Sequence, residues 1–219
     1  FKRTAFRGLV PCAFFSAVLA GAAAPASATL LPQSWNGWHW YRTGKLSIEI
    51  GNNVSAGWDP YLRSAAKVWS KDAVIDYVVG GSTTTAKACN ATFGTLQVCS
   101  ANYGATGWLG YTTIWTSGSQ ILQATIKFND YYFRSGKYDT DAFRRYVACQ
   151  ELGNALGLQD SDRNKTNLNT GSCMDYSNDP SGRLGTQNGV IKNVTVGVAD
   201  FINLAGIYAG SDRTQLPQT

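Results

Sequence analysis

The sequence predicts one domain of mixed α+β structure, with strands in its first half and helices in its second. An alternating apolar segment is followed by a helix start and a second strand-like run, and two further strand-like runs flank a short polar turn. Two helical patterns close the chain. Of the 219 residues, 44% are hydrophobic and 12% aromatic, which is ample for one buried core and too little for two comfortable domains.

The opening of the chain predicts a strand, a helix and a second strand. Leu46, Ile48 and Ile50 alternate with polar residues, which is typical of a half-buried strand. Asp59-Pro60 predicts a helix start, with Asp as N-cap and Pro in the first helical position. The apolar face of this helix consists of Leu62, Ala65, Ala66 and Trp69. A strand is predicted again at Val74 to Val79, which ends at a pair of glycines.

The middle of the chain predicts a loop and a hairpin. Residues 81–106 are rich in Gly, Ser, Thr and Asn, which favours a surface loop. Strands are predicted at Trp108 to Trp115 and at Gln120 to Asn129, joined by a turn at residues 116–119.

Two helices are predicted in the second half. A long one runs to Ala155, with N-cap candidates at residues 139–141, and Gly157 closes it because glycine readily adopts the left-handed conformation that ends helices. The last helix, Val198 to Ala209, is expected to pack through Phe201, Ile202, Ala205 and Tyr208.

Residues 1–28 have the features of a signal peptide, which leaves one domain at residues 29–219. Lys2, Arg3 and Arg7 precede an apolar run, and Ala26-Ser27-Ala28 matches a signal-peptidase site. The apolar run is about a dozen residues, too short for the roughly 20 of a membrane-spanning helix. Removal of the leader lowers the formal net charge from +5 to +2. We therefore expect a secreted protein with no membrane span after cleavage and no nucleic-acid partner, since no Lys/Arg cluster remains.

Four cysteines follow the leader: Cys89, Cys99, Cys149 and Cys173. An even number in an exported chain predicts two disulfides, for which three pairings are possible. The local pairing of Cys89 with Cys99 would leave Cys149 to pair with Cys173.

Aromatic residues crowd around the chain's only histidine. His39 lies among Trp35, Trp38, Trp40 and Tyr41. Such a cluster is typical of a core plug, and we expect His39 to be a buried, hydrogen-bonded core residue.

Residues 149–180 contain a motif with regular spacing. Its frame is Gln150-Glu151-x-x-Asn154-x-x-Gly157-x-x-Asp160, followed by the turn Cys173-Met174-Asp175-Tyr176. Residues four apart on a helix share a face, so positions 150 and 154 face one point, and Gly157 lets the chain double back towards it.

This frame resembles the metzincin family of zinc endopeptidases, in its matrixin-like branch, whose motif is H-E-x-x-H-x-x-G-x-x-H/D followed by a turn that contains methionine. The resemblance implies a zincin-like fold: a twisted, mostly parallel sheet with an antiparallel edge strand, packed on two long helices, plus a C-terminal helix. It makes Gln150, Asn154 and Asp160 the zinc-ligand positions and Glu151 the general base of an active enzyme. Met174 would be the hydrophobic floor of the site.

The ligand positions are degenerate. Zinc favours imidazole or thiolate, and a catalytic site needs three protein ligands. Gln150 and Asn154 offer neutral carboxamides, which are weak donors, so only Asp160 is a credible ligand. We therefore expect no cofactor, with zinc present only if the family function is retained.

These observations lead to three hypotheses. The first is a secreted, monomeric pseudoprotease that binds an extended peptide or protein, on an edge strand near residues 123–129. The second is an active metal-dependent endopeptidase with an atypical metal site. The third is a calcium-stabilised structural or adhesive domain, because Asp160-x-Asp162-x-Asn164 begins like a calcium loop, although Lys165 and Gly171 occupy two positions that such loops reserve for Gly and Glu.

Overall fold

The computed structural model describes residues 34–182 and 190–209. All the elements below belong to the unit formed by residues 31–219, which is distinct from residues 1–30. The predicted signal peptide, residues 1–28, lies outside the described residues. In the two described ranges, no helix has the length and apolar character needed to cross a bilayer.

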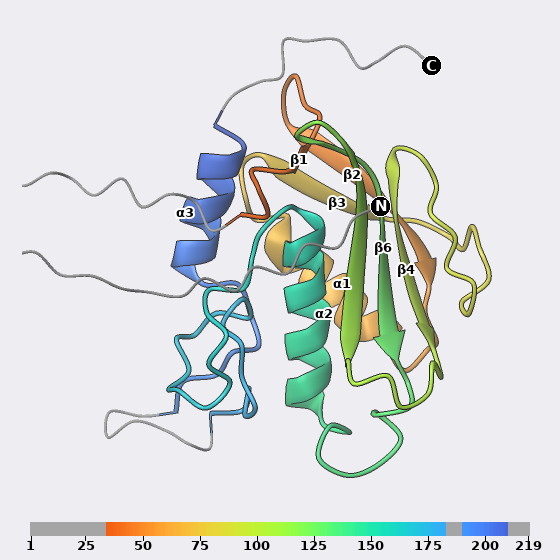
Figure 1. Cartoon of the computed structure of the whole chain (residues 1–219), viewed down its shortest axis with the longest axis vertical. Coiled ribbons are helices and arrows are strands. Elements are labelled where there is room, and N and C mark those ends of the chain that lie inside the picture. Colours follow the sequence, from red (N-terminus) through yellow and green to blue (C-terminus); the bar gives the residue numbers. More distant parts are fainter. Residues whose placement is uncertain (1–33, 183–189, 210–219) are drawn as a thin grey trace, which may run out of the picture. The chain divides into compact units, whose positions relative to one another are not determined.

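A six-stranded mixed sheet forms the centre of this unit (Figure 1). Its strands are β1 (His39–Trp40), β2 (Leu46–Asn53), β3 (Ile75–Val79), β4 (Thr95–Ala101), β5 (Gly110–Ser117) and β6 (Gln120–Asn129). The strand order is β1-β6-β4-β2-β3, and β5 pairs with β6. Every pairing is parallel except that of β5 with β6. The sheet is therefore mostly parallel with one antiparallel strand, as predicted.

Two helices, α1 (Asp59–Trp69) and α2 (Asp141–Ala155), lie together on one face of the sheet (Figure 1). The buried residues of α1 are the four that the sequence predicts. The N-cap of α1 is Trp58 rather than the predicted Asp59. The Trp58 ring stacks on Phe128 of β6 at 4.4 Å between centroids, so packing against the sheet fixes the start of this helix.

The prediction of a surface loop over residues 81–106 is wrong in its second half, because β4 lies there in the middle of the sheet. Leu96 and Val98 are fully buried, but so is Gln97, at 1% exposure. A strand that is buried on both faces shows no polar alternation, so periodicity could not identify it.

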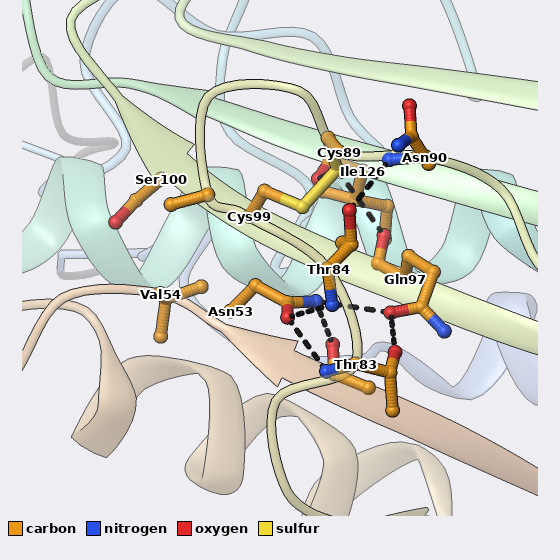
Figure 2. The surroundings of a disulfide bond; sticks show 12 residues. Asn53, Val54, Thr83, Thr84, Cys89, Asn90, Gln97, Cys99, Ser100 and Ile126 are labelled. Carbon is orange, nitrogen blue, oxygen red and sulfur yellow. Dashed lines mark hydrogen bonds between the residues drawn. A yellow bond between two sulfur atoms is a disulfide. The ribbon is translucent and has the colours of Figure 1, made fainter.

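The buried amides in this region satisfy one another (Figure 2). Gln97 Oε1 accepts hydrogen bonds from Asn53 Nδ2 at 3.0 Å and from the Thr83 hydroxyl at 2.6 Å. The Cys89–Cys99 disulfide joins the preceding loop to β4 beside this network. Because a buried polar group costs little once it is hydrogen-bonded, the network allows a polar sequence to occupy the sheet interior.

The predicted hairpin is present, with its first strand shifted by two residues to Gly110–Ser117 and its turn at Gly118, where φ is +58°. The expected edge strand at residues 123–129 is wrong. Those residues belong to β6, which pairs with both β4 and β5, whereas β5 pairs with β6 alone among the described residues. The free edge beside α2 therefore belongs to β5.

The last helix, α3 (Val198–Ile207), is present, but its predicted packing face is wrong in part. Ile202 is 65% exposed, while Leu204 and Asp200 are buried. Asp200 is buried because its carboxylate accepts hydrogen bonds from the Ser172 hydroxyl at 2.6 Å and from the Gly197 amide at 2.7 Å. The helix still packs on the core through Leu204 and, just after its end, through Tyr208.

Candidate functional site

Helix α2 places the motif residues beneath the free edge of the sheet. It begins after Thr140, whose hydroxyl accepts a hydrogen bond from the Phe143 amide at 3.2 Å, and it is followed by Gly157 with φ +91°. A Cβ at Gly157 would run into the carbonyl oxygen of Trp38. Glycine is thus required both by the left-handed backbone and by the close approach of another segment.

Two of the three ligand positions bond to each other. Gln150 Nε2 donates to Asp160 Oδ1 at 3.2 Å and to the Tyr146 hydroxyl oxygen at 2.9 Å. The chain after Gly157 therefore does double back, so that residue 160 meets residue 150. The carboxamide turns its N–H side, not its oxygen, towards the carboxylate.

Asn154, the third position, has no such partner. Its side-chain oxygen is buried without a hydrogen bond among the described residues. Its carboxamide contacts Glu151 instead, where it stabilises the charged form of that carboxyl and lowers its pKa.

Glu151 is buried, at 7% exposure, and is bonded to the edge strand. The Thr112 hydroxyl of β5 donates to Glu151 Oε2 at 2.5 Å. A Cβ at Gly110 would lie 2.5 Å from the other carboxyl oxygen. β5 therefore lies directly on this glutamate.

Burial raises the pKa values of both carboxyl groups. The pKa of Glu151 rises to about 7, mainly through desolvation and secondarily through the charge of Asp160, against the lowering effect of the Thr112 hydrogen bond. The pKa of Asp160 rises to about 6, again mainly through desolvation, with Arg163 opposing the rise and Asp162 adding to it. Glu151 is consequently about half protonated near neutral pH.

This shift predicts a pH-dependent effect of Glu151→Gln on stability. The ordinary pKa of a glutamate is 4.5, so between pH 4.5 and about pH 7 Glu151 keeps its proton in the folded chain but has released it in the unfolded chain. The contribution of Glu151 to the free energy of unfolding therefore falls as the pH rises through this range. The cost of the buried charge reaches roughly 3 kcal/mol above pH 7. Urea unfolding at pH 4.5 and pH 8 should show Glu151→Gln gaining stability relative to the unsubstituted chain by an amount of that order at the higher pH.

The matched control is Glu49→Gln, at an exposed position of β2, which should follow the unsubstituted chain at both pH values. Parallel pH dependences of the Glu151→Gln variant and the unsubstituted chain would contradict the prediction.

Met174 packs beneath α2. It is 1% exposed, and a Cβ at Gly153 would collide with its sulfur and would lie 2.7 Å from Trp69 Cζ2. The second disulfide, Cys149–Cys173, ties α2 to the Met174 turn. The two motif segments are thereby held together by packing and by a covalent bond.

The donor set does not fit zinc. Gln150 presents an N–H group to Asp160, and the part of the chain that the structure describes holds no group of three His, Cys, Asp or Glu side chains able to bind a metal. His39 lies in β1, with Nδ1 at 2.8 Å from the Gly37 carbonyl oxygen and its ring edge-on to Tyr208. It is partly rather than fully buried, which corrects the expectation of a core histidine.

The calcium-loop residues use their oxygens within their own turn. Asp162 accepts hydrogen bonds from the Asn164 amide at 2.9 Å and from Asn167 Nδ2 at 2.5 Å. The Asn164 side-chain oxygen accepts two from Thr166. These contacts are typical of a self-capped polar turn and give no support to a calcium site.

A cleft of about 420 Å³ opens beside Glu151. Its lining includes residues 107–110, which lead into β5, and residues 176–178, at the end of the Met174 turn and just after it. Gln150, Glu151 and Asp160 contribute to its lining, so the three acidic or amide groups face one space.

A second cavity, of about 210 Å³, lies further along β5, beside Thr112 and Ile114. It is lined by Trp35, Trp38, Thr112, Ile114 and Asn154. Of the predicted aromatic plug only Trp40 is a core residue, at 5% exposure, while Trp35 and Trp38 are partly exposed. Composition alone could not separate these tryptophans, since only the packing against α2 and β5 distinguishes them.

No protein-family model matches the chain, and no curated protein resembles it significantly in sequence. Among solved structures the chain is similar to myroilysin, with 15% identity and a TM-score of 0.43 over 82% of this chain and 84% of that one. It is also similar to high choriolytic enzyme 1, a hatching-enzyme zinc protease from the medaka fish Oryzias latipes, with 15% identity and a TM-score of 0.41 over 78% of this chain and 94% of that one. At these values neither likeness assigns any chemistry to the residues of this chain.

Proposed function

We propose that this chain is a secreted, monomeric, protease-like protein that does not cleave peptides but binds one in extended form along β5. The observation that carries the proposal is the hydrogen bond from Gln150 to Asp160, which joins two positions that would otherwise have to face a metal ion. The leader-like residues and the two disulfides support export, because disulfides persist in oxidising compartments.

A site of this kind that binds no zinc would lack the main source of catalysis. Zinc lowers the pKa of a bound water from about 15.7 to about 7, which is worth on the order of 12 kcal/mol of activation. The Thr112 hydroxyl donates a hydrogen bond to Glu151, but a hydrogen bond to the general base does not lower the pKa of a water molecule as a zinc ion does. In this proposal Glu151 holds β5 against α2.

The free edge of β5 supplies the binding surface. Unpaired strand edges present a row of N–H and C=O groups to which an extended peptide can add as a further strand. Gly110, Thr112 and Ile114 alternate along this strand and line the two cavities beside it. Backbone pairing would provide affinity, and the cavities would select side chains.

Backbone methylation of the ligand tests strand addition directly. A fluorescent peptide that binds the chain would be prepared with N-methyl groups either at its odd or at its even positions. Since only every second amide of an added strand faces the sheet, one series should lose at least tenfold in affinity by fluorescence anisotropy while the other binds normally. Equal losses in both series, or binding that survives both, would argue against pairing on β5.

Cleavage is tested separately. Purified chain should leave casein and labelled peptides intact with or without added zinc. Turnover that a chelator abolishes would overturn the non-catalytic proposal.

A second candidate is an active metal-dependent endopeptidase with an atypical site. The observation in its favour is the pKa of Glu151, about 7, which suits a general base at neutral pH. Carboxylates and carboxamides favour hard ions over zinc. Elemental analysis of dialysed native protein would show a stoichiometric metal if this candidate is correct.

A further inference from the structure

Backbone hydrogen bonds hold Trp35 and Trp38 in place, although neither is fully buried and only Trp38 packs in part against the core. The Trp35 amide donates to the Gly157 carbonyl at 2.9 Å, and the Trp38 amide donates to the Trp35 carbonyl at 2.8 Å. The neighbouring Trp40 fixes the segment, because its indole N–H donates to the Ala155 carbonyl at 2.7 Å. Two indole rings are thereby positioned at the end of α2 while both remain partly exposed.

These rings form the wall of the 210 Å³ cavity, and Ile114 adds to its apolar lining. Aromatic rings stack best on other flat rings, in offset or edge-to-face contact. A cavity of this size, lined by two indoles, suits one large aromatic side chain rather than an entire small molecule, for which pockets of roughly 300–1,000 Å³ are usual.

One polar group in the lining lacks a partner. The Asn154 carboxamide borders the cavity, and its oxygen is buried without a hydrogen-bond donor. Such orphan acceptors are uncommon in native structures. The terminal torsion of an asparagine is soft, so the carboxamide can turn its oxygen towards an occupant that brings an O–H group.

We propose that the cavity between Trp35, Trp38 and Ile114 binds a tyrosine side chain of the extended ligand, with the tyrosine hydroxyl donating to Asn154. This inference deepens the proposed function and rests on it for the peptide, although the cavity itself can be probed without one. Thr112 and Ile114 belong to β5, so a peptide paired on that edge passes directly over the cavity.

The probe is N-acetyl-L-tyrosinamide, compared with the phenylalanine and leucine analogues. The full chain is labelled with 5-fluorotryptophan, and its ¹⁹F resonances are assigned with Trp35→Phe and Trp38→Phe. The tyrosine probe should shift the resonances of Trp35 and Trp38 and bind about fivefold tighter than the phenylalanine probe, as one added hydrogen bond predicts. Shifts confined to the resonances of other tryptophans, or equal affinities for the tyrosine and leucine probes, would overturn the proposal that this cavity binds tyrosine.

Two variants separate the hydrogen bond to Asn154 from the aromatic contact with Trp38. Asn154→Leu should abolish the preference for tyrosine over phenylalanine while both probes still bind. Trp38→Ala should weaken the tyrosine probe at least tenfold, as expected for an aromatic anchor. The control is Phe93→Ala, an exposed aromatic that lines neither cavity and should leave binding unchanged. A preference for tyrosine that survives Asn154→Leu would contradict the proposed hydrogen bond.

Peptides then distinguish the two proposals. If the tyrosine probe shifts Trp35 and Trp38 but no extended peptide binds, the cavity assignment stands and the peptide-binding function fails. If peptides bind along β5 with no preference for tyrosine, the function stands and the cavity assignment fails.

Discussion

Replacing Gln150, Asn154 and Asp160 together by histidine is expected to give the chain a stoichiometric zinc ion and measurable cleavage of casein. Positions 150 and 154 are about one helical turn apart on α2, and Asp160 Oδ1 already lies 3.2 Å from Gln150 Nε2. Three imidazoles would therefore be presented to a common point, with Glu151 beside them. Structural sites in small peptides bind zinc with a free energy on the order of 10 kcal/mol or more, so the gain in zinc affinity should be large. Zinc content by elemental analysis and cleavage of labelled casein are the two measurements.

Two controls show which residues of the triple variant bind zinc and which one is needed for cleavage. Adding Glu151→Ala should abolish cleavage while leaving zinc bound, because the glutamate is not itself a ligand. Gln150→His alone should bind zinc weakly, since one imidazole and one carboxylate leave the site incomplete. A triple variant that folds normally and binds no zinc would show that these positions do not form a protease-type metal site.

Gly157→Ala is expected to lower the free energy of unfolding by about 3 kcal/mol or more. A residue with a side chain loses about 1–2 kcal/mol in the left-handed conformation that φ +91° requires. The new Cβ would also collide with the Trp38 carbonyl oxygen, and relieving such overpacking typically costs a further 1–3 kcal/mol or so. For a domain of this size we expect the melting temperature to fall by roughly 6–12 °C, measured by circular dichroism.

The matched control for this variant is Gly118→Ala, in the turn between β5 and β6. Gly118 also has a positive φ, +58°, but a Cβ there would meet no atom within 4 Å. It should therefore cost only about 1 kcal/mol, so the difference between the two variants measures the contact with Trp38. Equal losses would mean that the close approach at Gly157 contributes nothing.

Much of the fold could be predicted because its signals are local. The alternation of Leu46, Ile48 and Ile50 identifies β2, and the apolar stripe from Leu62 to Trp69 identifies the buried face of α1. The cap at Thr140 and the glycine at residue 157 bound α2 closely. Each of these signals depends on residues within one or two turns of each other, where backbone geometry fixes which side chains share a face.

Two of the wrong predictions, at β4 and at α3, have one cause in common. Gln97 is buried in β4 because Asn53 and Thr83 hydrogen-bond to it, and Asp200 is buried in α3 because Ser172 and Gly197 do the same. Patterns that count polar residues as exposed place both on the surface. The side-chain partners Asn53, Thr83 and Ser172 lie 14 to 44 residues away from the groups that they bond, so no local window contains them.

For the candidate site, the sequence by itself determined which chemical groups are available: one histidine in the whole chain, carboxamides at residues 150 and 154, and a glutamate between them. That inventory argues against a three-histidine zinc site before any geometry is considered. Only the tertiary structure decided what these groups do instead. It placed the amide of Gln150 against Asp160, bonded Glu151 to Thr112, made β5 the free edge, and left Trp35 and Trp38 lining a cavity. The physical reason is that residue types fix the donors and acceptors, whereas burial and pairing depend on segments that meet only after the chain has folded.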